Sequence, residues 1–234
     1  MKINRTSIAA TLVGCAMVSG AHAVDEPLAK QWQFDVALDG KAIGFHTFEL
    51  QQEGSKQVLT TEANFKVKFL FVTAFRYRHQ NIEIWDDDCL LSIDASTNSN
   101  GKQLDVRGEI TDGRFDLQSA EGPTTLPRCV QTFAYWNPAV LESQQLLNSQ
   151  TGVYEDVTVT LEGREQVAVA GEPVDALRYR LSAEAGDITL WYSSADKTWL
   201  GLEAPAKGGR KIHYHAAVVP DPDASQQIVA RSNQ

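Results

Sequence analysis

One stretch of the sequence decides how the chain is organised. It begins with Phe133-Ala134-Tyr135-Trp136-Asn137-Pro138 and runs on through Leu147-Asn148-Ser149-Gln150-Thr151-Gly152. On either side of it, apolar and polar residues alternate as they do in β-strands. Within it, Asn137 is a favourable helix N-cap and Pro138 suits the first helical position. We therefore predict one short helix over residues 138–147, held against a sheet because so short a helix is unstable alone.

The chain before this stretch reads as long antiparallel strands. Residues 32–52 predict a hairpin around Asp39-Gly40, with a β-bulge near Gly44. Residues 58–69 and 71–85 form two segments that are about twice as long as the usual strand of about five or six residues. Strands of this length favour a strongly curved sheet or a barrel wall over a small sandwich.

The alternation resumes near residue 156 and continues to residue 218, interrupted by glycine-containing turns. The predicted fold is all-β, an antiparallel meander of roughly twelve strands that forms a strongly curved open sheet or barrel. A β-sandwich is the alternative. Since no repeat or linker divides the chain, we expect a single β domain over residues 24–220 and a flexible C-terminal tail over residues 221–234.

The N-terminus predicts export. Lys2 and Arg5 precede an apolar run that ends at Ala21-His22-Ala23, a pattern typical of a signal peptide over residues 1–23. The run is shorter than the ~20 residues of a transmembrane span, so none is expected. We expect a periplasmic protein, and the alternative is a lipoprotein anchored through Cys15.

The charge balance argues against a nucleic acid partner. The full chain has 21 Lys and Arg against 30 Asp and Glu. Loss of residues 1–23 removes Lys2 and Arg5, which leaves 19 against 30 and a net charge of −11. An acidic protein of this kind is repelled by phosphate backbones and by anionic membrane surfaces.

Two cysteines, Cys89 and Cys129, remain if Cys15 leaves with the signal peptide. An even number of cysteines in an exported protein predicts a disulfide between them. The alternative is a pair of buried free thiols.

Motifs with a fixed catalytic mechanism, such as Gly-x-Ser-x-Gly and His-Glu-x-x-His, are absent from the sequence. We assign no catalytic residue, cofactor or metal. His213-x-His215 has a spacing that metal sites use, but Ile212 and Tyr214 occupy the apolar side of that strand and leave both imidazoles to solvent.

Candidate binding residues fall into two groups. Aromatic side chains of the long strands are expected to line a cavity, and amides that flank the predicted helix either satisfy its ends or line the mouth of a pocket. Residues such as Tyr77, Glu83 and Arg210 are either an acid–base group or ordinary cross-strand neighbours. The candidate ligand-binding residues are Phe65, Phe69, Phe75, Tyr77, His79, Trp85, Tyr135, Trp136, Asn137, Asn148, Gln150, Thr151, Trp191 and Arg210.

Several motifs of the sequence resemble those of a family of exported bacterial proteins known only as a domain of unknown function. They include Tyr77-x-His79, Glu83-x-Trp85, Tyr135-Trp136-Asn137-Pro138 and Leu190-Trp191-Tyr192. More distantly, the layout is similar to the periplasmic lipoprotein carriers of the LolA-like type. That resemblance implies a curved, incomplete barrel that binds acyl chains on its concave face, although this sequence supplies less helix than such a carrier has.

The function that we predict is non-enzymatic binding of a hydrophobic or amphipathic, lipid-like ligand in a curved β-sheet cavity. One alternative is an enzyme acting on an envelope glycan or ester through His79, Glu83 or Arg210. Another is a filled barrel that serves as an assembly partner of an envelope protein. A hollow interior is the observation that separates these hypotheses.

Overall fold

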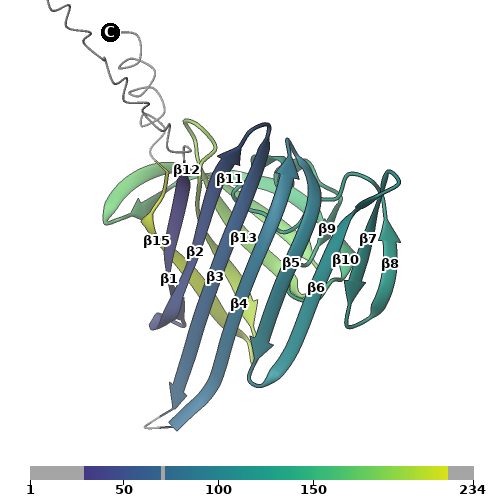
Figure 1. Ribbon diagram of the computed structural model, residues 1–234. Helices are drawn as coiled ribbons and strands as arrows, with labels where there is room; N and C mark the ends of the chain where they lie inside the picture. The colour runs from purple at the N-terminus through teal and green to yellow at the C-terminus, as the bar shows by residue number, and fades with distance from the viewer. Residues whose placement is uncertain (1–28, 70–71, 221–234) are drawn as a thin grey trace, which may run out of the picture.

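A computed structural model describes residues 29–69 and 72–220 (Figure 1). In these residues thirteen strands form one antiparallel sheet, and two short strands form a second one. The strands of the large sheet are β1 (Lys30–Leu38), β2 (Lys41–Glu53), β3 (Lys56–Phe69), β4 (Val72–Asp86), β5 (Cys89–Ser99), β6 (Lys102–Thr111), β7 (Arg114–Ser119), β8 (Gly122–Leu126), β11 (Thr158–Val169), β12 (Glu172–Ala183), β13 (Gly186–Ser193), β14 (Trp199–Ala206) and β15 (Arg210–Val218).

The order of the strands joins the two halves of the chain through β1. Strands β1 to β8 follow one another in sequence, strands β11 to β15 do the same, and β15 pairs with β1. The sheet is not closed, because β8 and β11 stand at opposite ends of the strand order. Figure 1 shows the first half, coloured purple to teal, curving in front of the green to yellow second half. The prediction of an all-β, curved antiparallel sheet, open or closed to a barrel, is confirmed in its open form, and the sandwich alternative is not observed.

The β-bulge predicted near Gly44 is present. Val36 pairs with Gly44 while Ala37 pairs with Ala42, so one extra residue lies in β2 at this point. A side chain at Gly44 would bring its Cβ to 1.8 Å from the carbonyl oxygen of Asn64 on β3. Only glycine allows the two backbones to approach this closely, and the resulting kink adds to the curvature of the sheet.

Residues 127–157, which we call the interior segment, leave the edge of the sheet and cross its concave side before β11 begins. Val130, Val140, Leu146 and Leu147 of this segment are fully buried, as are Phe34 and Trp199 on the sheet. The segment therefore fills much of the space that the curved sheet encloses, and its apolar residues belong to the same core as those of the strands.

The predicted helix over residues 138–147 is wrong in length. A 3-10 helix, η1, covers only Pro138–Glu142, and Ser143 already has an extended backbone. The chain continues as β9 (Gln145–Leu147), which pairs with β10 (Tyr154–Asp156). Burial of both Leu146 and Leu147 explains the difference, because an extended backbone directs neighbouring side chains to opposite faces and each finds core there.

The predicted N-cap at Asn137 is confirmed. Its side-chain oxygen accepts a hydrogen bond from the backbone N–H of Ala139 at 3.0 Å, and Pro138 occupies the first turn. The predicted disulfide between Cys89 and Cys129 is also confirmed. Next to it, the backbone N–H of Leu90 donates to the carbonyl oxygen of Val130 at 3.0 Å. The start of the interior segment is thus fastened to β5 by a covalent bond and a hydrogen bond.

The fifteen strands among the described residues exceed the roughly twelve expected, because short strands such as β8 and β10 lack a clear apolar alternation. The predicted signal peptide over residues 1–23, including Cys15, and the predicted tail over residues 221–234 lie outside the described residues. Over residues 29–69 and 72–220, no helix has both the length and the apolar character needed to cross a membrane.

Candidate functional site

A cavity of about 460 Å³ lies between the concave face of the sheet and the interior segment. Strands β2 to β5 form one wall, the interior segment forms a second, and β13 to β15 with the β12–β13 turn form the third. The cavity therefore depends on both halves of the chain. Its apolar lining includes Phe48, Leu59, Phe65, Phe75, Ile188, Trp199, Leu202 and Ile212.

A row of polar side chains from β4 enters this cavity. Tyr77, His79, Asn81 and Glu83 alternate along the strand and all line the cavity, because every second residue of a strand faces the same side. On the opposite side of the strand Ile82 is 50% exposed. Over this part of β4 the polar side chains therefore point inward, and the apolar Ile82 points outward.

Glu83 is a buried carboxylate with its own hydrogen-bond donors. It accepts from the side-chain amide of Asn81 at 2.8 Å and from the indole N–H of Trp85 at 3.0 Å. Burial raises the pKa of Glu83 to about 6, while hydrogen bonds from Asn81, Thr132 and Trp85 oppose the increase. The carboxylate is therefore largely ionised at pH 7 and already engaged by protein groups.

Two histidines at the cavity are held neutral. His79 Nδ1 lies 2.9 Å from the hydroxyl of Thr97 on β5, and burial lowers the pKa of His79 to about 4. His46 Nδ1 on β2 lies 3.1 Å from the hydroxyl of Tyr214 on β15. Burial, with a smaller contribution from His79, lowers the pKa of His46 well below its usual value. Near neutral pH both imidazoles act as uncharged hydrogen-bonding groups.

The tyrosines of the site are neutral as well. Burial raises the pKa values of Tyr77, Tyr135 and Tyr214 above the ordinary value of a phenol. The ring of Tyr77 stacks on that of Phe65 with centroids 5.2 Å apart. These phenols add aromatic surface and neutral hydroxyl groups to the walls of the cavity.

Four buried polar atoms that border the cavity have no hydrogen-bond partner within the described part of the chain. They are His46 Nε2, Thr61 Oγ1, Asn81 Oδ1 and Trp136 Nε1. Leaving a buried donor or acceptor unpaired costs about 1–3 kcal/mol per group. Natural cores avoid this cost, so four such atoms around one cavity leave hydrogen-bonding capacity that ordered water or another molecule in the cavity would satisfy.

The structure brings together many of the residues proposed from sequence. Those at the cavity are Phe65, Phe75, Tyr77, His79, Tyr135, Trp136, Asn148 and Gln150. Phe69 ends β3, and its side chain lies outside the described residues.

Three other candidates serve the packing around the cavity and do not line it. Trp85 packs edge-on against Trp136 with ring centroids 5.7 Å apart. Asn137 caps η1 and donates its side-chain amide to the carboxylate of Asp88 at 3.0 Å. The hydroxyl of Thr151 accepts from the N–H of Val153 within a tight turn.

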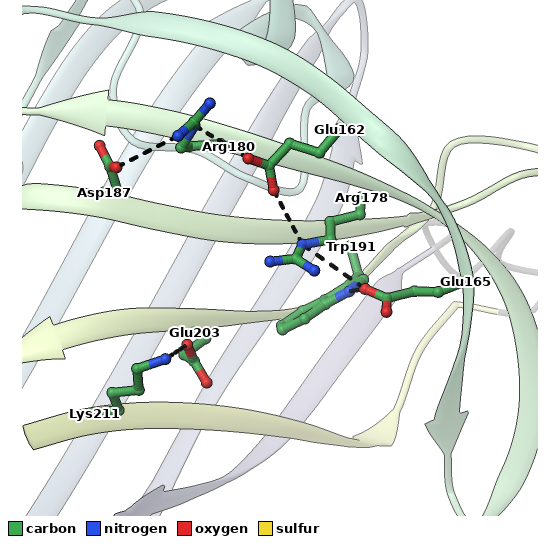
Figure 2. Close-up of polar contacts among 8 residues, drawn as sticks. All are labelled: Glu162, Glu165, Arg178, Arg180, Asp187, Trp191, Glu203 and Lys211. Carbon is green, nitrogen blue, oxygen red and sulfur yellow. Dashed lines mark hydrogen bonds and ion pairs between the residues drawn. The ribbon is translucent and has the colours of Figure 1, made fainter.

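Trp191 and Arg210 lie away from the cavity. Figure 2 shows Trp191 beside Glu165, whose carboxylate accepts its indole N–H at 2.6 Å. The Nε of Arg210 donates to the carbonyl oxygen of Lys207 at the turn before β15. Sequence reasoning placed both at the site because it could not tell which face of a strand is concave.

The neighbourhood of Trp191 is a surface network of ion pairs. Arg178 and Arg180 each contact the carboxylate of Glu162, at 3.1 and 3.2 Å (Figure 2). Lys211 and Glu203 form another pair at 2.6 Å. Because these side chains are partly exposed, each pair contributes little to stability.

Sequence reasoning did not propose His46, Thr61, Asn81, Thr132 and Tyr214 as cavity residues, although all line it. The available signal was the unbroken alternation Tyr77-x-His79-x-Asn81-x-Glu83 on β4. Phe75, Tyr77 and His79 of this face were among the candidates, but an aromatic lining was expected, so the polar residues that continue the same face were not included.

Comparison with known proteins places this architecture among proteins of unknown function. A solved structure described as a beta-barrel-like protein of domain of unknown function DUF1849, from Brucella abortus, is similar with a TM-score of 0.60 and 9% sequence identity. The match covers 83% of this chain and 99% of that one. At such low identity the likeness shows the fold alone, and no curated protein matches the chain. The model of the family described as domain of unknown function DUF6134 matches residues 34–217, and the chain belongs to this family.

Proposed function

We propose that this chain is a non-enzymatic binding protein of the periplasm that holds a hydrophobic or amphipathic, lipid-like molecule in the cavity of its curved sheet. The observation that carries the proposal is an aromatic-lined cavity around which four buried polar atoms have no partner among the described residues. A packed barrel serving only as an assembly partner would have no reason to keep such atoms unpaired.

The dimensions of the cavity support a chain-like ligand. Its volume of about 460 Å³ lies within the range of about 300–1,000 Å³ that small-molecule sites occupy. Phe75 and Glu83, which both line it, are eight positions apart on β4, which corresponds to roughly 25 Å along a strand. A cavity that is long for its volume suits an extended apolar chain better than a compact molecule.

The apolar lining supplies the binding energy in this proposal. Burial of hydrocarbon contributes about 25 cal/mol per Å² of apolar surface, so an acyl chain in contact with Phe65, Phe75 and Ile212 is stabilised without any charged partner. The interior segment covers the chain from the other side. The resemblance of the sequence to LolA-like carriers, if it extends to the fold, would imply the same mode of binding.

The enzymatic alternative has weaker support. His46 and Tyr214, whose side chains hydrogen-bond at the cavity, are titratable groups in mutual reach. Burial lowers the pKa of the imidazole and raises the pKa of the phenol, so neither carries the charge or the near-neutral pKa that acid–base catalysis uses. Both groups are better suited to accepting and donating hydrogen bonds.

The proposal is tested by recovering the full chain without detergent and recording its native mass spectrum, together with uptake of a fluorescent fatty acid analogue. We expect a co-purifying small molecule or saturable uptake. Ala204 lines the cavity, so Ala204→Phe should reduce uptake at least tenfold, whereas Ala168→Phe at an exposed site on β11 should leave it unchanged. Absence of both a bound molecule and uptake contradicts the proposal.

Export is tested separately, on the chain expressed in a Gram-negative bacterium with its own N-terminus. Fractionation should recover it in the periplasm, and the mass of its N-terminal peptide should begin at Val24. A lipid-modified Cys15 at the N-terminus would support the membrane-anchored alternative. A cytoplasmic protein that retains residues 1–23 would contradict export.

A further inference from the structure

The polar atoms at the cavity gather at one part of it. Thr61 on β3 lies directly opposite Asn81 on β4, and both residues are only 4% exposed. His46 on β2 lies opposite Ala63, the next inward position of β3 after Thr61. Three of the four unpaired atoms therefore come from neighbouring positions on three adjacent strands, and they face the cavity that these strands line.

The apolar part of the cavity continues along the same strands. Phe65 and Tyr77 form the next inward pair toward the far end of β3 and β4, with their rings stacked. Phe75 follows on β4. A ligand bound along β4 thus meets hydrocarbon and aromatic surface at one end and hydrogen-bonding groups at the other.

Charge distinguishes among the polar groups that this end could accept. Of the described residues that line the cavity, Glu83 and Glu155 are acidic and none is lysine or arginine. His46 and His79 do not supply a positive charge either, because burial lowers their pKa values. A carboxylate or phosphate placed here would be a buried anion without a counter-charge, beside another anion.

An ammonium group is also a poor fit. The carboxylate of Glu83 already accepts hydrogen bonds from Asn81, Trp85 and Thr132, which leaves about one of its roughly four acceptor positions for the three N–H donors of an ammonium group. The unpaired atoms call for both a donor and an acceptor, since Asn81 Oδ1 can only accept and Trp136 Nε1 can only donate. Hydroxyl and amide groups provide both functions without a charge.

We propose that the ligand's polar end is an uncharged hydroxyl or amide group that hydrogen-bonds to the cluster formed by His46, Thr61 and Asn81. The ligand class is a neutral amphiphile such as a long-chain alcohol, an acylglycerol or an acyl amide. This inference rests on the proposed binding function and adds the selectivity of the same site, against fatty acids and long-chain amines.

The test uses the full-length protein and four probes with the same hydrocarbon chain, which are dodecanol, dodecanamide, dodecanoate and dodecylamine. Their affinities are measured at pH 8 from the change in tryptophan fluorescence, since Trp136 and Trp199 line the cavity. We expect dodecanol and dodecanamide to bind at least tenfold more tightly than the two charged probes. Dodecanoate or dodecylamine binding as tightly as dodecanol would overturn the inference while leaving the binding function intact, and failure of all four would count against both.

A matched pair of variants locates the polar end. Thr61→Val replaces the inward hydroxyl by a methyl group of similar size, and Thr60→Val makes the same change at the exposed neighbouring position of β3. Thr61→Val should weaken dodecanol binding at least threefold, and Thr60→Val should not change it. Equal affinities of the two variants for dodecanol would overturn the placement of the head group. The comparison of probes on the unmodified protein remains decisive if Thr61→Val does not fold.

Discussion

His79→Gln should make the protein less sensitive to acid. In the folded protein the pKa of His79 is about 4, lowered by burial, against an ordinary value of 6.5. A histidine with a lowered pKa binds its proton more readily in the unfolded chain, so the stability it contributes is present at neutral pH and is lost as pH falls from 6.5 toward 4. The glutamine side chain can still hydrogen-bond to Thr97 but does not titrate in this range.

The magnitude follows from these pKa values. Between pH 7 and pH 4.5, His79 should lower the free energy of unfolding by about 2 kcal/mol. His46 acts in the same direction, because its pKa is also lowered. Glu83 acts in the opposite direction, because its pKa is raised from 4.5 to about 6 and its protonation stabilises the fold as pH falls through that window. The two histidines outweigh the single carboxylate, so the native protein should lose stability on acidification.

The measurement is urea unfolding followed by tryptophan fluorescence at pH 7 and pH 4.5. The loss of unfolding free energy between the two values should be about 2 kcal/mol smaller for His79→Gln than for the native protein. Glu83→Gln should give a loss roughly 1–2 kcal/mol larger, since it removes the opposing contribution. Gln80→Ala, at the exposed neighbouring position of β4, is the control and should show the same loss as the native protein. Identical losses for His79→Gln and the native protein would refute the conclusion that His79 is held neutral.

Two further changes test what holds the interior segment and the sheet together. Replacing Cys89 and Cys129 by serine opens a loop with a sequence separation of 40. The free energy of unfolding, measured by chemical denaturation under oxidising conditions, should fall by about 4 kcal/mol. An unchanged free energy of unfolding would show that the interior segment is held without the disulfide. Gly44→Ala should destabilise the fold by about 1–3 kcal/mol more than Gly163→Ala. Both glycines have similar φ angles, but only at Gly44 would an added Cβ clash with a neighbouring strand. Equal shifts of the melting temperature for the two variants would contradict this interpretation of the bulge.

Most of the fold could be predicted from local patterns in the sequence. The long strands β3 and β4, the turn at Asp39-Gly40 and the bulge at Gly44 follow from alternation and turn residues, which act over a few neighbours. The pairing of Cys89 with Cys129 followed from counting cysteines. The helix over residues 138–147 was overestimated because burial of Leu146 and Leu147, a tertiary effect, prevailed over the local helix signal.

The sequence alone determined the β character of the chain, its antiparallel order and the aromatic residues available for a cavity. Only the tertiary structure decided how far the cavity extends along β4, to the polar side chains of Asn81 and Glu83, and that Trp191 on β13 lies outside it. The physical reason is that the period-two pattern of a strand is the same for both faces. Which face is enclosed depends on the direction in which the sheet curves and on where the interior segment packs, and those depend on contacts between residues far apart in the chain.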